Sequence, residues 1–112
     1  MLPKPNRLNL ADHFLRLKKY GRALKIPYFT LLWLPRRDNQ NTTRVGFVVS
    51  NRLGKATTRN YLRRRLRETV KINLAQIPPG LDLALIANPK THDASLEELS
   101  LNFADLLTHL KP

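Results

Sequence analysis

Apolar and polar residues follow two different spacings along the chain, and the changes between them predict the order of its elements. Apolar residues in segment 10–17 recur at near-helical spacing, which predicts a short helix begun by Asn9 or Asp12 and ended by Gly21. The segment before it, residues 1–8, contains two prolines and is expected to form an irregular, basic arm.

Longer apolar runs predict the strands. Segments 28–34 (YFTLLWL) and 44–50 (RVGFVVS) are typical of strands, and the turn-forming residues between them predict a hairpin with a long loop. An extended segment at Arg22–Ile26 can pair with the first of these strands. The run Leu81–Ala87 (LDLALIA) predicts a buried strand.

Two further helices are predicted in the second half of the chain. One begins near residues 56–58, continues to about Ala75 and ends at the Pro-Pro-Gly of residues 78–80. Ser95, followed three residues later by Glu98, resembles a capping box, which predicts a last helix that continues to Leu110. The apolar face of that helix consists of Leu99, Phe103, Leu106, Leu107 and Leu110. The order of elements predicts an α+β fold, a single-domain α–β sandwich with helices packed on a small sheet.

Charge is concentrated in the first two thirds of the chain. The whole chain has 20 Lys and Arg against 8 Asp and Glu, a formal net charge of +12. Residues 1–71 carry 18 basic and 3 acidic residues, a net charge of +15, whereas residues 72–112 carry 2 and 5, a net charge of −3. Such a local concentration is expected of a surface that binds a polyanion, and nucleic acid is the favoured partner.

The remaining composition narrows the function classes. No apolar run approaches the roughly 20 residues of a membrane span, and the N-terminus lacks the apolar stretch of a signal peptide. The lack of cysteine leaves no thiolate metal site and fits a cytoplasmic protein. The three histidines have no metal-ligand spacing, and the acidic residues form no close pair within a strand or loop, so no catalytic residue is expected.

The segment from about Ala56 to Lys71 separates into an apolar and a basic side when it is projected as a helix. The apolar stripe, which is expected to pack on the sheet, consists of Leu62, Leu66, Val70 and Leu74. The basic flank beside it consists of Asn60, Arg64, Arg67 and Lys71, with Arg59 and Arg63 at its edge. Arg65 falls on the opposite side, near Tyr61 and Ile72.

Phosphate is the ligand that this basic flank is expected to bind. Arginine presents a planar fork suited to bidentate phosphate contact, and the helix N-terminus adds free N–H groups. Arg52 and Lys55 precede that terminus and extend the site. A solvated face normally mixes charges, whereas Glu68 is the only acid between Asp38 and Asp82, so a nucleic-acid surface is favoured.

Segment 44–68 (RVGFVVSNRLGKATTRNYLRRRLRE) resembles the signature of the bacterial ribonuclease P protein component. In that family an xxGxxVS strand leads through a Gly-Lys/Asn-Ala loop into an arginine–asparagine helix, and the order of the other elements is similar over nearly the whole chain. The resemblance implies an α–β sandwich like the second domain of ribosomal protein S5, forming one RNA-binding domain over residues 1–112. It also implies a left-handed βαβ crossover around the arginine-rich helix, opposite to the general rule.

The resemblance further implies a function. The chain would be the protein subunit of the ribonucleoprotein endonuclease ribonuclease P, which removes the 5′ leader from precursor tRNA. Its RNA subunit would perform the cleavage with magnesium, while the protein binds the RNA subunit and the leader, without a membrane or an obligate protein partner. By their positions in the motif, the resemblance implies RNA contacts for Arg59, Asn60, Arg63, Arg64 and Arg67, together with Arg52 and Lys55. Phe14 would line a leader cleft between the sheet and the first helix.

The sequence departs from the family pattern near both sites. Tyr61 stands where a basic residue usually follows Arg-Asn, and a small loss of binding is expected there. Lys18 and Leu32 stand where the leader cleft often has aromatic residues, and strand alternation points Trp33 to the other face. Because stacking contributes ~1–3 kcal/mol per base, leader binding is expected to be weaker or to depend more on charge.

Other interpretations of the same features remain open. A structural ribosomal protein or assembly factor without an enzyme association would show the same basic surface. A DNA-binding helix is less favoured, because an arginine-dense helix packed on a sheet suits backbone contact rather than base readout. Phe14, like Phe29, Phe47 and Trp33, is also a candidate for the hydrophobic core, and only the resemblance gives it a function.

Overall fold

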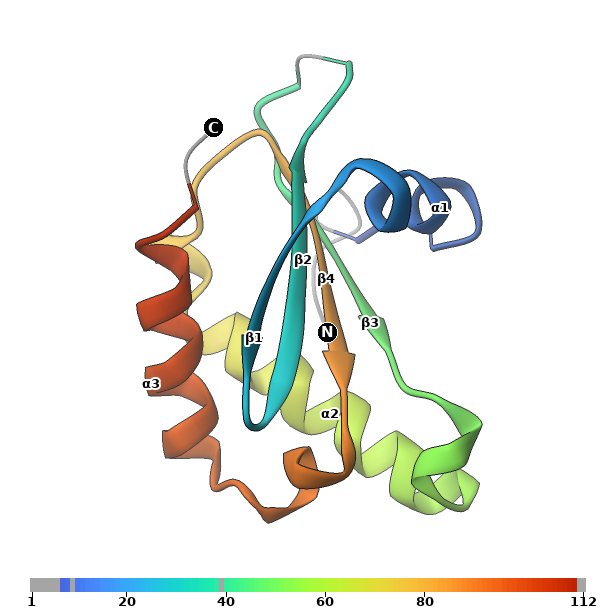
Figure 1. Cartoon of the computed structure of the whole chain (residues 1–112). Helices are drawn as coiled ribbons and strands as arrows, with labels where there is room; N and C mark the ends of the chain where they lie inside the picture. The colour runs from blue at the N-terminus through green and yellow to red at the C-terminus, as the bar shows by residue number, and fades with distance from the viewer. Residues whose placement is uncertain (1–6, 9, 39, 111–112) are drawn as a thin grey trace.

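The sheet and the helices that cover it are shown in Figure 1, a computed structural model in which residues 7–8, 10–38 and 40–110 are described. The helices are α1 (Leu10–Tyr20), α2 (Ala56–Ile72) and α3 (Leu96–Leu107). The strands are β1 (Arg22–Ile26), β2 (Phe29–Pro35), β3 (Arg44–Val48) and β4 (Leu81–Ala87). Short 3-10 turns are η2 (Asn51–Leu53), η3 (Leu74–Gln76) and η4 (Pro89–Asp93). Helix α1 packs on one face of the sheet and α2 and α3 on the other, which confirms the predicted α+β sandwich.

Strand β4 lies inside the sheet, whose order is β1-β2-β4-β3. β1 pairs antiparallel with β2, as expected, and β2 pairs antiparallel with β4. β3 pairs parallel with β4, so the predicted hairpin between segments 28–34 and 44–50 is wrong. The physical reason is that β4 is buried along nearly its whole length, and a strand that is apolar on both faces belongs inside the sheet, where it separates β2 from β3.

A parallel pair of strands needs a crossover connection, and α2 supplies it between β3 and β4. In Figure 1, β3 and β4 both point downward, α2 returns the chain behind the sheet, and β4 lies to the left of β3. This path is a left-handed crossover, as the family resemblance implied and against the usual right-handed preference. The crossover places the N-terminus of α2 beside the end of β3, with only η2 and a short loop between them.

The larger hydrophobic core lies between the sheet and the two helices α2 and α3. Leu62, Leu66 and Val70 are buried, which confirms most of the predicted apolar stripe, while Leu74 lies beyond the helix in η3 and is half-buried. All five residues predicted for the apolar face of the last helix are buried as well. This packing fixes one side of α2 against the sheet and leaves the opposite side open to solvent.

Helix α2 begins within the predicted range and ends at Ile72, three residues before the predicted Ala75. The side chain of Asn73 follows the helix and donates from Nδ2 to the carbonyl oxygen of Thr69 (3.0 Å) and to the hydroxyl of Ser100 (3.0 Å). These bonds satisfy the last turn of α2 and join it to α3, and the chain continues as a 3-10 turn.

Helix α1 has the predicted extent. It begins at Leu10 and ends before Gly21, while the predicted start Asn9 and residues 1–6 of the predicted arm lie outside the described residues. A Cβ atom at Gly21 would collide with the carbonyl oxygen of Leu17, which explains why the helix ends at a glycine.

A smaller core lies between α1 and the sheet. Its buried members are Leu8, Leu17 and Ala84, with Phe14, Leu32 and Leu34 packed against them. The N–H of Leu8 donates to the carbonyl oxygen of Val45 (3.0 Å), so this end of the predicted arm lies along the outer edge of β3. Strand alternation thus separates the sheet into an α1 face and an α2–α3 face with different cores.

The predicted capping box at the start of α3 is confirmed. The N–H of Glu98 donates to Ser95 Oγ (3.0 Å), and the N–H of Ser95 donates to Glu98 Oε1 (3.1 Å). The hydroxyl of Tyr28 donates to the other carboxylate oxygen of Glu98 (2.9 Å), which ties the β1–β2 hairpin to α3. The Ser95 N–H above all, and then the Tyr28 hydroxyl, lower the pKa of Glu98. α3 itself ends at Leu107, before the predicted Leu110.

Replacing Glu98 by glutamine is expected to lower the melting temperature at neutral pH and to have little effect in acid. A carboxyl group whose pKa is lowered by folding stabilises the protein above its unfolded pKa, and this contribution is lost as the pH falls through the folded pKa. The difference between wild type and Glu98→Gln should therefore shrink below roughly pH 4. Thermal unfolding followed by circular dichroism across this range measures the effect, and a pH-independent difference would contradict it.

Candidate nucleic-acid interface

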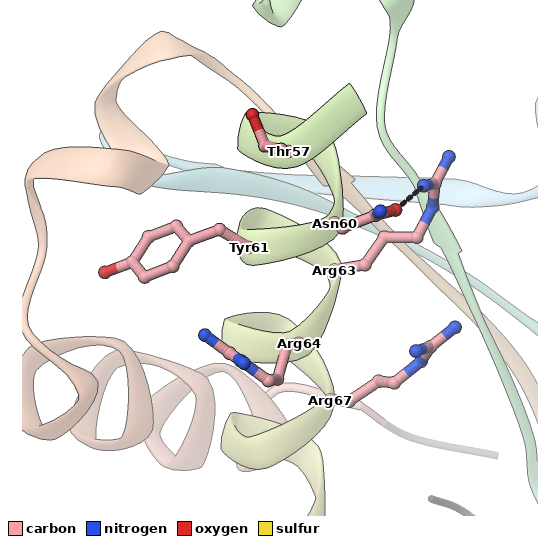
Figure 2. Close-up of a pocket in the computed structure, with 6 residues that line it drawn as sticks. All are labelled: Thr57, Asn60, Tyr61, Arg63, Arg64 and Arg67. Atoms are coloured by element: carbon pink, nitrogen blue, oxygen red, sulfur yellow. Dashed lines mark hydrogen bonds between the residues drawn. The ribbon is translucent and has the colours of Figure 1, made fainter. Parts of the chain in front are cut away.

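The solvent-facing side of α2 carries a hollow lined by polar and basic side chains. The residues that line it are Thr57, Asn60, Tyr61, Arg63, Arg64 and Arg67. Figure 2 shows that they come from successive turns of one helix, with Asn60, Arg63 and Arg67 projecting to one side and Tyr61 and Arg64 to the other. Because the leucines of α2 anchor its far side in the core, the helix presents these groups from a fixed support.

Neighbouring side chains contact the arginines on this surface, and Arg64 lies near the Tyr61 ring, 6.0 Å from its centroid. Arg63 donates from Nη1 to Asn60 Oδ1 (3.3 Å), and the guanidinium of Arg67 lies 6.0 Å from the ring centroid of Phe47 on β3. Arg64 and Arg67 are exposed. Within the described ranges, no carboxylate lies within ion-pair distance of the arginines of this hollow. Their charge is thus available to an external anion, and phosphate fits the fork of donors.

The loop before α2 holds the other predicted contacts, and they do not line the hollow. Arg52 in η2 and Lys55 at the N-cap of α2 are both exposed. Arg59 is half-buried and donates from Nη1 to Asn51 Oδ1 (2.7 Å), so its side chain is directed toward this loop. Gly54 allows the loop to turn, because its φ of 137° is a conformation that other residues rarely adopt.

Phe14, the residue expected to line a leader cleft, lies on the α1 face of the sheet. It is half-buried, packs near Leu32 and Leu34, and has the Lys18 ammonium 5.6 Å from its ring centroid. Trp33 is buried on the opposite face, as strand alternation predicted. At the two positions where the family often has further aromatic residues, this chain has the aliphatic Leu32 and the basic Lys18, and both lie near Phe14.

The α1 face of the sheet is only partly covered. The aligned residues Thr30, Ile86 and Val48 form one row across β2, β4 and β3 on this face, and all three are half-buried. This row lies toward the other end of the sheet from the row formed by Leu34, Asp82 and Arg44. Helix α1 packs over that second row. The row of Thr30, Ile86 and Val48 is therefore a more accessible part of this face than the buried Ala84 and Asp82.

A buried charge cluster beneath α1 was not predicted. Asp82 is fully buried and accepts from Arg44 Nε (2.7 Å) and Nη2 (2.9 Å), and Arg16 Nη1 lies 3.7 Å from it. This bond to Asp82 raises the pKa of Arg44 above its ordinary value. Arg16 also donates to the carbonyl oxygen of Pro35 (3.1 Å), so the cluster fixes α1 on the sheet. Only the parallel register, which pairs residue 44 with residue 82, brings these charges together.

A second cluster, of which only the Arg65 contact was expected, surrounds Tyr61. The Arg65 guanidinium lies 5.1 Å from the centroid of its ring and donates to its hydroxyl, as expected for Arg65 on the Tyr61 side of the helix. The ring of His92, in η4, lies 5.3 Å away at an angle of 49°. The projection indicated the neighbourhood of Arg65, whereas no sequence signal indicated His92.

The described part of the chain offers no cluster of three His, Asp or Glu side chains that would hold a metal ion. In the same residues, no helix has both the length and the apolar character needed to cross a bilayer.

Comparisons with known proteins agree on one family. The family model described as Ribonuclease P matches residues 2–111. The ribonuclease P protein component of Chloroflexus aurantiacus is 37% identical over 102 residues, covering 90% of this chain and 74% of that protein. The corresponding component of Thermotoga maritima is 39% identical over 84 residues, covering 75% and 70%. The solved structure of the RNase P protein from Thermotoga maritima superposes with a TM-score of 0.84 and 30% identity, covering 95% of this chain and 98% of that one.

Proposed function

Because the chain belongs to the family of bacterial ribonuclease P protein components, we propose that its two faces contact two different RNAs. The chain is the protein subunit of the ribonucleoprotein that processes the 5′ end of precursor tRNA, and it associates with ribonuclease P RNA. In this proposal, α2 and the loop before it bind the RNA subunit. The α1 face of the sheet binds the 5′ leader of the substrate.

The observation that carries the first assignment is the hollow on α2, with its three arginines and Asn60. None of these arginines is paired with a carboxylate in the described residues, and each can reach a phosphate oxygen. Arg52 and Lys55 extend the surface toward the start of the helix, where backbone N–H groups and a partial positive charge also favour phosphate. Arg59 contributes at the edge, where its bond to Asn51 holds the loop against α2.

The leader assignment is supported by the half-buried ring of Phe14 on the α1 face, and by the row of half-buried residues that crosses the same face. An unpaired base can stack on an aromatic ring, and Lys18 places positive charge nearby for the phosphates. With Lys18 and Leu32 in place of further aromatics, one ring instead of several would hold the leader.

The chemistry of cleavage is assigned to the RNA subunit. The donor set of the described residues does not fit a resident magnesium site, because no three carboxylates or histidines converge. We propose that the protein acts by positioning RNA, as one RNA-binding domain, with magnesium serving the RNA subunit. We place this work in the cytoplasm, where bacterial precursor tRNA is made.

Phe14→Ala tests the leader assignment. The holoenzyme carrying this variant is expected to bind precursor tRNA roughly tenfold less tightly than wild type, because one stacking contact of ~1–3 kcal/mol is removed. Its affinity for mature tRNA without a leader, and the affinity of the protein for the RNA subunit, should stay unchanged. Binding is measured with precursor tRNAs that differ only in leader length.

Leu15→Ala is the matched control, because Leu15 is the next residue of α1 and is 74% exposed. It should leave all three affinities unchanged. Equal losses for precursor and mature tRNA in Phe14→Ala, or weaker binding to the RNA subunit, would show that Phe14 has a structural role instead.

A further inference from the structure

Tyr61 is the one aromatic side chain that lines the hollow on α2. It also lines a second, neighbouring hollow with Arg64, Arg65 and Glu68, so its half-buried ring separates two depressions on the helix surface. Two arginine side chains lie near the ring: the guanidinium of Arg64 lies 6.0 Å and that of Arg65 5.1 Å from its centroid.

The position of the Tyr61 ring is fixed by contacts outside the basic hollow. Arg65 donates to the hydroxyl, and the His92 ring packs against it at a centroid distance of 5.3 Å. η4, which carries His92, is itself fixed, because Thr91 Oγ1 accepts from the Asn88 N–H (3.0 Å). A ring that is already held in place loses little conformational freedom when a ligand stacks on it.

From this arrangement we propose that Tyr61 is a stacking platform for one unpaired base of ribonuclease P RNA. The inference rests on the proposed function, because it assumes that α2 faces the RNA subunit. Proteins recognise unpaired RNA by stacking bases on aromatic rings and on arginine planes, while basic side chains bind the adjoining phosphates. Arg64 is exposed, so its guanidinium can cover the far side of the base or bind the next phosphate.

The RNA subunit, not the leader, is the partner that this position favours. α2 packs on the sheet face opposite to the one that carries Phe14, so a nucleotide on Tyr61 is separated from the leader by the sheet. Figure 2 shows Tyr61 and Arg64 on the same side of the helix, whereas Arg63 and Arg67 lie on the other side. A strand of RNA that crosses α2 from the Arg63 and Arg67 side would thus first make phosphate contacts with these arginines, and would then reach the Tyr61 ring on the other side of the helix.

Under this proposal, Tyr61 contributes to RNA binding in a different way from the basic residue that the family usually has at this position. In place of the phosphate contact of a basic residue, the chain gains a contact with a base, which is insensitive to salt. The two kinds of contact are therefore distinguished by the salt dependence of binding, because only the ionic contact releases counterions.

Tyr61→Leu, Tyr61→Phe and Tyr61→Lys test the platform through the affinity for ribonuclease P RNA at several salt concentrations. Tyr61→Leu is expected to weaken binding about tenfold with an unchanged salt slope. Tyr61→Phe keeps the ring and should bind within about twofold of wild type. Tyr61→Lys should steepen the salt slope by about one, because it exchanges stacking for a phosphate contact. Chemical probing of the RNA should show one unpaired nucleotide that wild type and Tyr61→Phe protect and Tyr61→Leu does not.

Each other result overturns the platform. If Tyr61→Phe loses as much affinity as Tyr61→Leu, the hydroxyl and not the ring makes the contact. If Tyr61→Leu binds like wild type while a variant lacking Arg64 and Arg67 binds weakly, the platform fails and the RNA-binding role of α2 stands. If neither Tyr61→Leu nor the variant lacking Arg64 and Arg67 changes binding, the platform and the RNA-binding role of α2 both fail.

His92→Ala is the control for packing, because it removes the supporting ring and keeps Tyr61. If His92→Ala loses as much affinity as Tyr61→Leu and lowers the melting temperature by the same amount, Tyr61 has a structural role.

Discussion

Replacing Arg64 and Arg67 together by alanine is expected to weaken binding to ribonuclease P RNA about 100-fold at physiological salt. Each exposed guanidinium lacks an internal carboxylate partner among the described residues, so each can make a charge-assisted contact of about 1.5 kcal/mol, and two such contacts correspond to a factor of this size. The slope of log affinity against log salt should fall by roughly two, because two phosphates are no longer neutralised. Filter binding or fluorescence anisotropy at several salt concentrations measures both quantities.

Lys18→Ala with Lys19→Ala is the matched control for this experiment. It removes the same amount of charge from exposed positions of α1, on the other face of the sheet. Binding to the RNA subunit alone should change little. Equal losses in the two double variants would mean that net charge, and not the surface of α2, determines the affinity.

Replacing Arg44 by methionine is expected to destabilise the protein by about 3–5 kcal/mol, since it leaves the charge of Asp82 buried without its main partner. The more distant Arg16, 3.7 Å away and at the surface side of the cluster, is placed to compensate only in part. Urea unfolding measures the change, and the variant should also loosen α1, which the cluster fixes on the sheet.

The double variant Arg44→Met with Asp82→Leu separates the ion pair from the packing. Buried ion pairs replaced by apolar residues of similar volume are often as stable as the original. The double variant is therefore expected to recover most of the stability that Arg44→Met loses. A double variant as unstable as the single one would show that the loss comes from packing and not from an unpaired charge.

The elements whose signals are local in the sequence were predicted well. The spacing of Leu62, Leu66 and Val70 located the buried side of α2, and the Ser95–Glu98 spacing located the start of α3, because both depend on neighbours within one or two helical turns. The pairing of the strands was not local. Segments 28–34 and 44–50 both have the alternation of a strand, and nothing in the turn between them shows that β4 will lie between them.

In the candidate site, too, the features with local sequence signals were predicted better than the contacts between distant segments. Helical spacing predicted a basic flank of Asn60, Arg64, Arg67 and Lys71, and the first three line one hollow, whereas Lys71 does not. Within that hollow, Arg64 projects to the side opposite to Asn60 and Arg67. The contacts of Tyr61 with His92 and of Asp82 with Arg44 link residues 31 and 38 positions apart. Such contacts depend on how elements pack, and a single sequence carries no signal for them.

The place of β4 inside the sheet also has a consequence for the newly made chain. β4 bonds to both β2 and β3, yet it follows them in the sequence, so the ribosome releases both of its neighbours before the strand that joins them. Until then, the first 71 residues, with a net charge of +15, have no complete sheet on which to fold. A nascent segment of this kind attaches to any RNA within reach, since ionic contacts need no defined shape. Late, cooperative folding should therefore convert an indiscriminate polycation into a selective subunit only at the end of translation.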